Sequence, residues 1–217
     1  MKVHRMAWLG CVAVFGAWSA VAATNTFEVP SFRGQAGTTF DGWEEFSVAV
    51  GNPGNKGDLP TSSGNATLYQ TAAGALVLGS RNLYNGTSAS KFEIRYGGAE
   101  PVGQVVFQAR SLGTELDYES VNLFAWAESL PGVRTELERT PSGGPPGTPG
   151  SGYSVTSEWS WDISSLNANN FAIVFDAKEL NLSLDSATVD VKYVPEPGVL
   201  ALSGLGLAVL LVLARRR

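Results

Sequence analysis

The chain has 217 residues, of which 44% are hydrophobic, and its 15 basic and 20 acidic residues give a net charge of −5 at pH 7. Five of the basic residues lie close to the two ends, so residues 24–194 carry 10 basic and 19 acidic residues, a net charge of −9. This part has no basic cluster, which argues against nucleic-acid binding, because that function needs positive charge along the phosphates.

The N-terminal residues have the pattern of a secretory signal peptide. Positive residues precede an apolar stretch over 6–21, and a cleavage site of small residues follows at Val21-Ala22-Ala23. We expect a signal helix over residues 1–23, the alternative being an uncleaved N-terminal anchor. The only cysteine (Cys11), the only histidine (His4) and both methionines lie in this segment. A mature chain would therefore lack disulfides, Cys or His nucleophiles, Ser-His-Asp triads and ordinary zinc sites.

The first half of the central region predicts short strands separated by turns. Alternation of large and small side chains is typical of half-buried strands. It predicts strands over residues 26–32, 44–50, 66–71, 75–78, 91–96 and 104–110. We expect the strands at 66–71 and 75–78 to pair with each other. Turn-forming residues predict a turn at 40–43 and loops at 51–64 and 82–88.

The second half continues the same pattern. Residues 120–127 are apolar on both faces, which predicts a central strand covered on both sides, whereas 134–139 predicts a polar edge strand. Further strands are predicted over residues 153–161, 171–175, 180–184 and 187–193. The Gly/Pro-rich residues 140–152 could be an interdomain linker, but the strands on either side favour a long hairpin loop.

About ten short strands and no amphipathic helix indicate an all-β domain over residues 24–193. Strands at this spacing are typical of an antiparallel sandwich or barrel. Among these we favour a jelly-roll-like β-sandwich. The F-x-I-x-F strand at 171–175, followed by residues 182–187 and a last strand, resembles the final strand pair of galactose-binding-like carbohydrate modules.

One acidic motif has the pattern of a glycosidase site. Glu115, Asp117 and Glu119 alternate, so on a strand their carboxylates would share one face, about 7 Å apart between neighbours. Retaining glycosidases need two carboxyl groups about 5 to 5.5 Å apart. The motif resembles that of laminarinase-type jelly-roll glycosidases, which implies Glu115 as nucleophile, Asp117 as its helper and Glu119 as acid/base. Those enzymes have longer chains with many sugar-binding aromatics after the motif. We therefore favour a solvated loop or strand edge and expect no catalytic residue.

Tryptophans are candidates for a surface that stacks on sugar rings. Tryptophans at alternating strand positions usually belong to the core, which is our interpretation of Trp159 and Trp161. Trp43, beside a glycine and two acidic residues, and Trp126 are the candidates for such a sugar platform.

Four acidic residues lie near the two ends of the predicted domain. They are Glu28, Asp41, Asp185 and Asp190. The ends of a jelly roll meet, and carboxylate oxygens are ligands that calcium prefers, so these residues are candidates for a structural calcium site. No other cofactor is expected.

The last 24 residues, 194–217, have three parts in a fixed order: the segment Val194-Pro195-Glu196-Pro197-Gly198, the uncharged residues 198–214, and Arg215-Arg216-Arg217. The prolines keep the first part extended. Seventeen residues of helix span about 25 Å, and snorkelling arginines with slight thinning make up the difference to a hydrocarbon core of about 30 Å. We predict a transmembrane helix with the arginines on the cytoplasmic side.

This order of motif, helix and arginines resembles the PEP-CTERM sorting signal of exported proteins in Gram-negative bacteria. The resemblance implies recognition by an exosortase, a membrane transpeptidase-like enzyme, and often a biofilm or exopolysaccharide setting. The segments Trp43 to Phe46 and Leu112 to Tyr118 resemble those of uncharacterised PEP-CTERM proteins, which imply no chemistry. The alternative is an ordinary tail anchor preceded by a chance Pro-Glu-Pro.

We therefore expect an exported, non-enzymatic envelope or matrix protein with a structural or adhesive role. Its expected partners are the secretion machinery, an exosortase and the inner membrane, followed by display in the envelope or release. The alternatives are a carbohydrate-binding module and a retaining glycosidase that uses Glu115 and Glu119.

Overall fold

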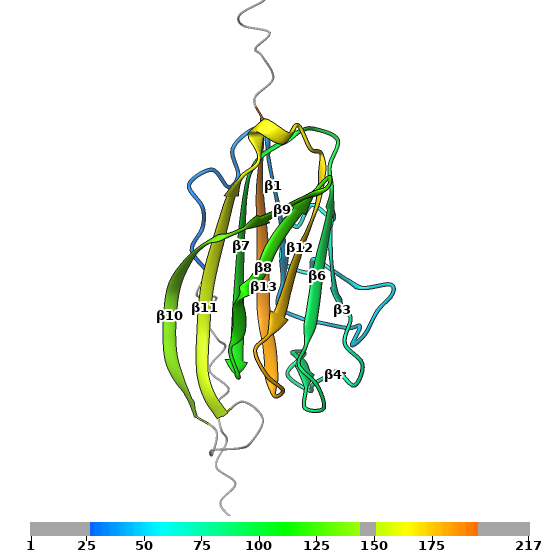
Figure 1. The fold of residues 1–217 in the computed structure, drawn as a ribbon, viewed down its shortest axis with the longest axis vertical. Coiled ribbons are helices and arrows are strands. Elements are labelled where there is room, and N and C mark those ends of the chain that lie inside the picture. Colours follow the sequence, from blue (N-terminus) through cyan, green and yellow to red (C-terminus); the bar gives the residue numbers. More distant parts are fainter. Residues whose placement is uncertain (1–26, 144–150, 195–217) are drawn as a thin grey trace, which may run out of the picture.

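The computed structural model describes residues 27–143 and 151–194. In these residues the chain is all-β and forms two antiparallel sheets packed face to face as a β-sandwich (Figure 1). The predicted signal segment, most of the Gly/Pro-rich loop and the sorting signal from Pro195 onward lie outside the described residues. Within residues 27–143 and 151–194, no helix has the length and hydropathy needed to span a membrane.

Sheet A has seven strands in the order β10-β11-β7-β13-β5-β4, and β1 also pairs with β13. Its strands are β1 (Thr38–Trp43), β4 (Leu76–Val77), β5 (Leu83–Asn85), β7 (Val102–Gly113), β10 (Val133–Gly143), β11 (Ser151–Asp162) and β13 (Leu182–Tyr193). The last strand of the chain is therefore central in this sheet, and it pairs with β7 on one side and with β1 and β5 on the other.

Sheet B has six strands in the order β2-β3-β6-β12-β8-β9. Its strands are β2 (Asn55–Lys56), β3 (Ala66–Gln70), β6 (Lys91–Gly97), β8 (Leu116–Ala125), β9 (Glu128–Pro131) and β12 (Asn170–Ala177). A single 3-10 turn, η1 (Ser164–Leu166), connects β11 in sheet A to β12 in sheet B.

Aromatic side chains on the inner faces join the two sheets. Phe175 of β12 lies opposite Phe92 of β6, and their rings stack with centroids 4.9 Å apart. Phe175 also contacts Phe107 of sheet A at 4.9 Å, and Phe107 in turn stacks on Trp159 at 5.4 Å. Each such pair contributes about 0.5–1.5 kcal/mol beyond the burial of its area. The predicted core positions of Trp159 and Trp161 are confirmed, since both are at most 5% exposed.

Several predicted strands are present, all but β3 with longer bounds, since β3 ends one residue early at Gln70. They are β3, β6, β7, β10, β11 and β12. β10 lies at the edge of sheet A, as predicted. It pairs with β11 from Val133 opposite Ser160 to Gly143 opposite Ser151, so the Gly/Pro-rich segment connects a hairpin, also as predicted.

Two predicted strands near the start of the domain are wrong. The described residues of 26–32 form no strand, and β1 occupies the predicted turn at 40–43 instead. Residues 44–50 also form no strand, because side chains satisfy their backbone. The Asp58 carboxylate accepts from the amides of Glu44 and Glu45, each at 2.9 Å. The Asn55 side-chain oxygen accepts from the amides of Ser47 and Val48, at 2.8 and 2.9 Å. These local bonds replace a strand ladder.

The predicted pairing of 66–71 with 75–78 is also wrong. β3 pairs with β2 and β6 in sheet B, whereas β4 pairs with β5 in sheet A. The predicted loop at 82–88 contains β5, because Leu83 is fully buried opposite Leu184 of β13. The chain thus crosses between the sheets where a local hairpin was expected.

Two further expectations are corrected along β8 and β13. The outer face of β8 is open, since Phe124 is 41% exposed, so this strand is not covered on both sides. The two predicted strands at 180–184 and 187–193 are one strand, β13, in which Asp185 forms a bulge opposite β7. A bulge adds a residue without ending the ladder.

Candidate functional site

The end of the sandwich where β13 stops lies directly before the predicted sorting motif. The amide of Tyr193 donates to the carbonyl of Gly37 at 2.9 Å, and the amide of Val194 donates to the carbonyl of Pro101 at 2.8 Å. Figure 1 shows β13 ending beside η1 at this end of the molecule. The residue that precedes Pro195 is therefore held on the folded domain.

A hydrogen-bond chain connects this exit to the opposite sheet. The hydroxyl of Tyr193 pairs with that of Tyr96 at 2.8 Å, and Tyr96 pairs with Thr39 at 3.0 Å. Burial raises the pKa of Tyr96 above its usual value near 10. The chain of hydroxyls fixes the last residues of β13 across the sandwich.

A cavity of about 330 Å³ lies beside the exit. It is lined by Gly103, Gln104, Asp162, Ser164, Lys192, Tyr193 and Val194. Asp162 accepts from the amide and hydroxyl of Ser164 at 3.0 and 2.7 Å, and these bonds lower its pKa. The cavity thus offers one cation, Lys192, and one carboxylate held in a turn, Asp162.

Trp126 lies at the same end of the sandwich. It is 67% exposed in the two-residue turn between β8 and β9, and its indole Nε1 donates to the carbonyl of Leu166 in η1 at 3.2 Å. Of the four tryptophans that the structure describes, this is the exposed one.

The sugar platform predicted from Trp43 and Trp126 does not form. Trp43 is fully buried, and its Nε1 donates to the carbonyl of Asn55 at 2.9 Å. Its ring packs in the core because β1, rather than a turn, contains it. Trp43 therefore cannot stack on a ligand, and only Trp126 stays available.

The four candidate calcium ligands are not brought together. Asp41 accepts from the Ser63 hydroxyl and from two backbone amides. Asp190 is paired with Arg33, and Asp185 accepts from Asn82 at 2.9 Å. Across the residues that the structure describes, no three acidic, His or Cys side chains group as a metal site would require. The calcium prediction is therefore corrected, because each of these three carboxylates already has a protein partner.

Glu28 makes its contacts through the backbone. Its amide and carbonyl both bond the side chain of Gln108, at 3.0 and 2.7 Å. This pairing holds the segment before β1 on the outer face of sheet A.

Glu115 is part of an ion-pair network rather than of a carboxylate pair. Arg139 of β10 donates to both of its carboxylate oxygens, and the Tyr118 hydroxyl donates to Oε2 at 2.7 Å. Arg139 also pairs with Glu136 at 3.0 Å. The Arg139 hydrogen bonds lower the pKa of Glu115 to about 2.

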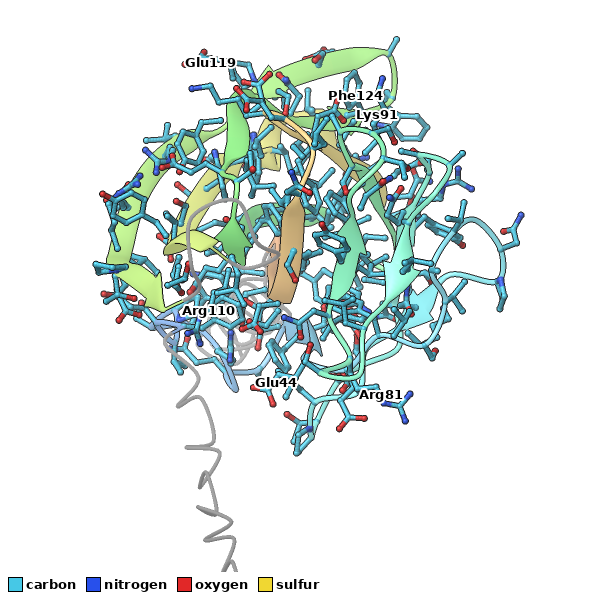
Figure 2. The ribbon with its side chains drawn as sticks, turned by 90° about the horizontal axis from the view of Figure 1, so that it is seen from below. Glu44, Arg81, Lys91, Arg110, Glu119 and Phe124 are labelled. Atoms are coloured by element: carbon cyan, nitrogen blue, oxygen red, sulfur yellow. The ribbon has the colours of Figure 1, made fainter. Side chains whose placement is uncertain are left out.

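The three acidic residues of this motif do not line one regular strand face. Glu115 precedes β8. Within β8, Asp117 lies opposite Asp176 of β12, and Asn122 lies opposite Val174. Five steps along β8 thus match two steps along β12, so β8 bulges between Asp117 and Asn122. The bulge is held by Ser120, which accepts from the Asp176 amide at 2.8 Å. Glu119 points outward on the side opposite Arg110 (Figure 2). The arrangement that the glycosidase resemblance implies is therefore not assembled.

The structure adds an arginine that sequence reasoning missed. Arg134 lies over the Tyr118 ring at 3.5 Å and donates to the Ser157 hydroxyl at 3.0 Å, so it joins β8 to sheet A. These partners are distant from Arg134 in the sequence. The sequence showed only the alternation within residues 134–139, which does not reveal such contacts. Arg134 and Arg139 together make the edge of the sandwich a cross-sheet salt-bridge network.

Comparison with known proteins gave no match. No family model matches the chain, and no curated protein or solved structure is significantly similar to it.

Proposed function

We propose that this chain is the precursor of an exported cell-envelope or matrix protein with a structural or adhesive role. Residues 198–214 anchor it in the inner membrane, and an exosortase of the PEP-CTERM type recognises Val194 to Gly198. The protein is then displayed in the envelope or released. The single observation that carries this proposal is the position of Val194, whose amide is bonded to Pro101 at the rim of the sandwich. The last strand, β13, is complete before the motif, so recognition there does not require the domain to unfold.

A non-enzymatic role is supported by the state of the acidic motif. Glu115 is neutralised by Arg139, and its lowered pKa fits a structural ion pair. A retaining glycosidase needs one carboxyl group with a raised pKa close to an ionised one. The ion pair instead ties the start of β8 to the edge strand β10.

The sandwich is proposed to be a jelly roll. When β1, β6, β7, β8, β9, β11, β12 and β13 are lettered B to I, sheet A has the order B-I-D-G and sheet B the order C-H-E-F. This is the strand order of two interlocked Greek keys. It supports the resemblance to carbohydrate modules at the level of topology only.

The C-terminal mass of the mature protein tests the main proposal. The full chain is expressed in a Gram-negative host with and without an exosortase, and its C-terminal peptide is identified by mass spectrometry. We expect a chain shortened within residues 194–198 only when the enzyme is present. Replacing Pro195 and Pro197 by Ala should restore the uncut mass. A wild-type chain that still ends at Arg217 beside an active exosortase would overturn the proposal.

A carbohydrate-binding module is the second candidate. The observation that favours it is the pair of exposed aromatic side chains on the β8–β9 hairpin, Phe124 and Trp126, which are 41% and 67% exposed. Exposed aromatic rings commonly mark binding surfaces. Tryptophan fluorescence titrated with a panel of polysaccharides tests it. In a chain without the leader, which carries Trp8 and Trp18, the signal would report on Trp126, because Trp43, Trp159 and Trp161 are buried. Absence of any shift would remove this candidate.

A further inference from the structure

The elements around the chain exit form one continuous surface. The amide of Ile163 donates to the carbonyl of Gly103 at 2.8 Å, which places the start of η1 beside the start of β7. Val194 is bonded to Pro101, next to the same strand. Trp126 reaches η1 through Leu166. We call the surface made by Trp126, η1, Pro101 and Val194 the exit surface.

The backbone at Trp126 indicates that its exposed ring is retained against local preference. Its φ is +54°, in the left-handed region where Gly, Asn and Asp are favoured. A bulky residue there has a steric cost, because its Cβ comes too close to the following carbonyl oxygen. The ring is 67% exposed, so core packing recovers little of that cost. Strain held at an exposed aromatic residue points to a binding role.

The length of chain beyond the exit limits how far this surface can lie from a membrane. Val194 and the first residue of the uncharged stretch, Gly198, are four residues apart. Four residues of fully extended chain span at most about 14 Å. The headgroup layer on each side of a bilayer is roughly 5–8 Å thick. When residues 198–214 span the bilayer, Val194 therefore lies within about 14 Å of the hydrocarbon core, among the headgroups or just outside them.

We propose that the exit surface is a membrane-docking face in the anchored precursor, with the Trp126 indole placed among the lipid headgroups. This inference rests on the proposed membrane anchor. Tryptophan suits that depth, because its ring is apolar and its N–H is polar. Glu100, Asp162 and Lys192 near this surface are exposed and of mixed sign, so attraction to anionic lipid is not the driving force. Docking would hold the sorting motif at the membrane, where a membrane-embedded enzyme acts.

Quenching by brominated lipid tests this inference on the full chain. The protein is reconstituted into phosphatidylcholine vesicles with and without bromine on the upper acyl carbons. Flotation measures anchoring, and loss of tryptophan fluorescence measures contact. We expect stronger quenching in the wild type than in Trp126→Asn. The leader tryptophans, Trp8 and Trp18, contribute equally in the wild type and in the variant, so the difference between the two reports on Trp126. The quenching should persist from about 0.1 to 1 M salt, over which the screening length falls from about 10 to 3 Å.

A matched variant moves the reporter to the other end of the sandwich. Leu180 lies in the turn between β12 and β13 and is 47% exposed, and its carbonyl accepts from Thr114, just after β7 ends. The double variant Trp126→Asn with Leu180→Trp should float but show no quenching beyond that of Trp126→Asn. Trp126→Asn alone should keep its melting temperature, since Asn suits the positive φ, which separates lost contact from lost folding.

Each outcome decides between the two proposals. A chain that floats with Trp126-dependent quenching supports both. A chain that floats without such quenching overturns the docking face and leaves the anchor standing. A chain that does not float overturns the anchor and the docking face with it. A Trp126 signal that responds only to added polysaccharide assigns the ring to a glycan and overturns membrane docking.

Discussion

At the scale of single residues, the most consequential interaction is the ion pair of Arg33 and Asp190. Asp190 is fully buried on β13, and Arg33 donates to its Oδ2 at 2.6 Å and to its other oxygen through Nε. Arg33 also lies over the Phe40 ring at 3.9 Å. Burial raises the pKa of Asp190 and Arg33 opposes that rise. The pair joins the segment before β1 to the central strand.

Removing only one partner should be costly. We predict that Arg33→Met lowers the free energy of unfolding by about 3 kcal/mol, because a buried carboxylate then has no counter-ion. The loss should shrink on acidification, since a carboxyl group whose folded pKa is raised gains stability as pH falls through that pKa. Urea unfolding at several pH values measures both effects.

Two variants control this prediction. Arg33→Met combined with Asp190→Leu should recover most of the loss, because no buried charge is left unpaired. Arg95→Met breaks the exposed pair with Glu93 and should cost at most about 1 kcal/mol. Equal losses for Arg33→Met and Arg95→Met would contradict the assignment of Asp190 as a buried charge that depends on its partner.

Glu115 gives a second prediction with the opposite pH dependence. Its pKa falls from a usual value near 4.5 to about 2, so the stability it contributes is present above pH 4.5 and is lost as pH falls toward 2. Glu115→Gln should cost about 0.5–1 kcal/mol at pH 7, a small value because the pair is partly exposed. Its unfolding free energy should converge with that of the wild type near pH 2.

The same variant tests the glycosidase resemblance. Any hydrolysis of a β-glucan or xyloglucan by the wild type that survives Glu115→Gln removes Glu115 as nucleophile. Hydrolysis that is present in the wild type and lost in the variant would restore the enzymatic alternative.

At the scale of elements, the segment before β1 acts as a cover on the outer face of sheet A. This face is polar, and Gln108, Thr188 and Asp190 on it are at most 1% exposed. Gln108 bonds both backbone groups of Glu28, so one side chain of β7 holds the cover in place. A strand is not needed there, because side chains satisfy the backbone.

We predict that Gln108→Leu releases this cover. Two backbone groups of Glu28 lose their partners, which should cost about 1–3 kcal/mol. Limited proteolysis should then cut within residues 27–37 faster than in the wild type. Gln104→Leu, on the same strand but less buried, is the control and should leave the cleavage rate unchanged. A rate that Gln108→Leu does not change would show that other contacts hold the segment.

At the scale of the whole molecule, the sandwich closes on its last strand. β13 lies between β7 and β1 in sheet A, and its final residues are bonded to Gly37, Pro101 and Tyr96. The domain therefore depends on residues up to Val194, which is also where the proposed processing begins. Cleavage after this point can leave the fold intact.

Truncation tests that statement. A chain ending at Val194 should unfold within about 2 °C of the full chain, since a change of 1 kcal/mol moves the melting temperature by only about 2–4 °C at this size. A chain ending at Asp185 should not fold, because it loses most of a central strand. Thermal unfolding followed by circular dichroism compares them. A large loss on cutting after Val194 would mean that the later residues support the domain.

Local features of this protein could be predicted from its residues. Period-2 alternation decided which residues of β11 and β12 face the core, because neighbouring strand side chains point to opposite sides. The same alternation identified Trp159 and Trp161 as core, and the Gly/Pro-rich segment as a hairpin connection.

Features that depend on distant partners emerged only in the folded chain. Trp43 is buried because β1 pairs with the last strand of the chain, and Glu115 is neutralised by an arginine 24 residues away. Residues 44–50 alternate like a strand but are held by Asn55 and Asp58. Alternation reports which side chains are apolar, but not which strand, carboxylate or amide comes to lie opposite them. That information arises when loops bring remote segments together, so the candidate sites changed more than the strands did.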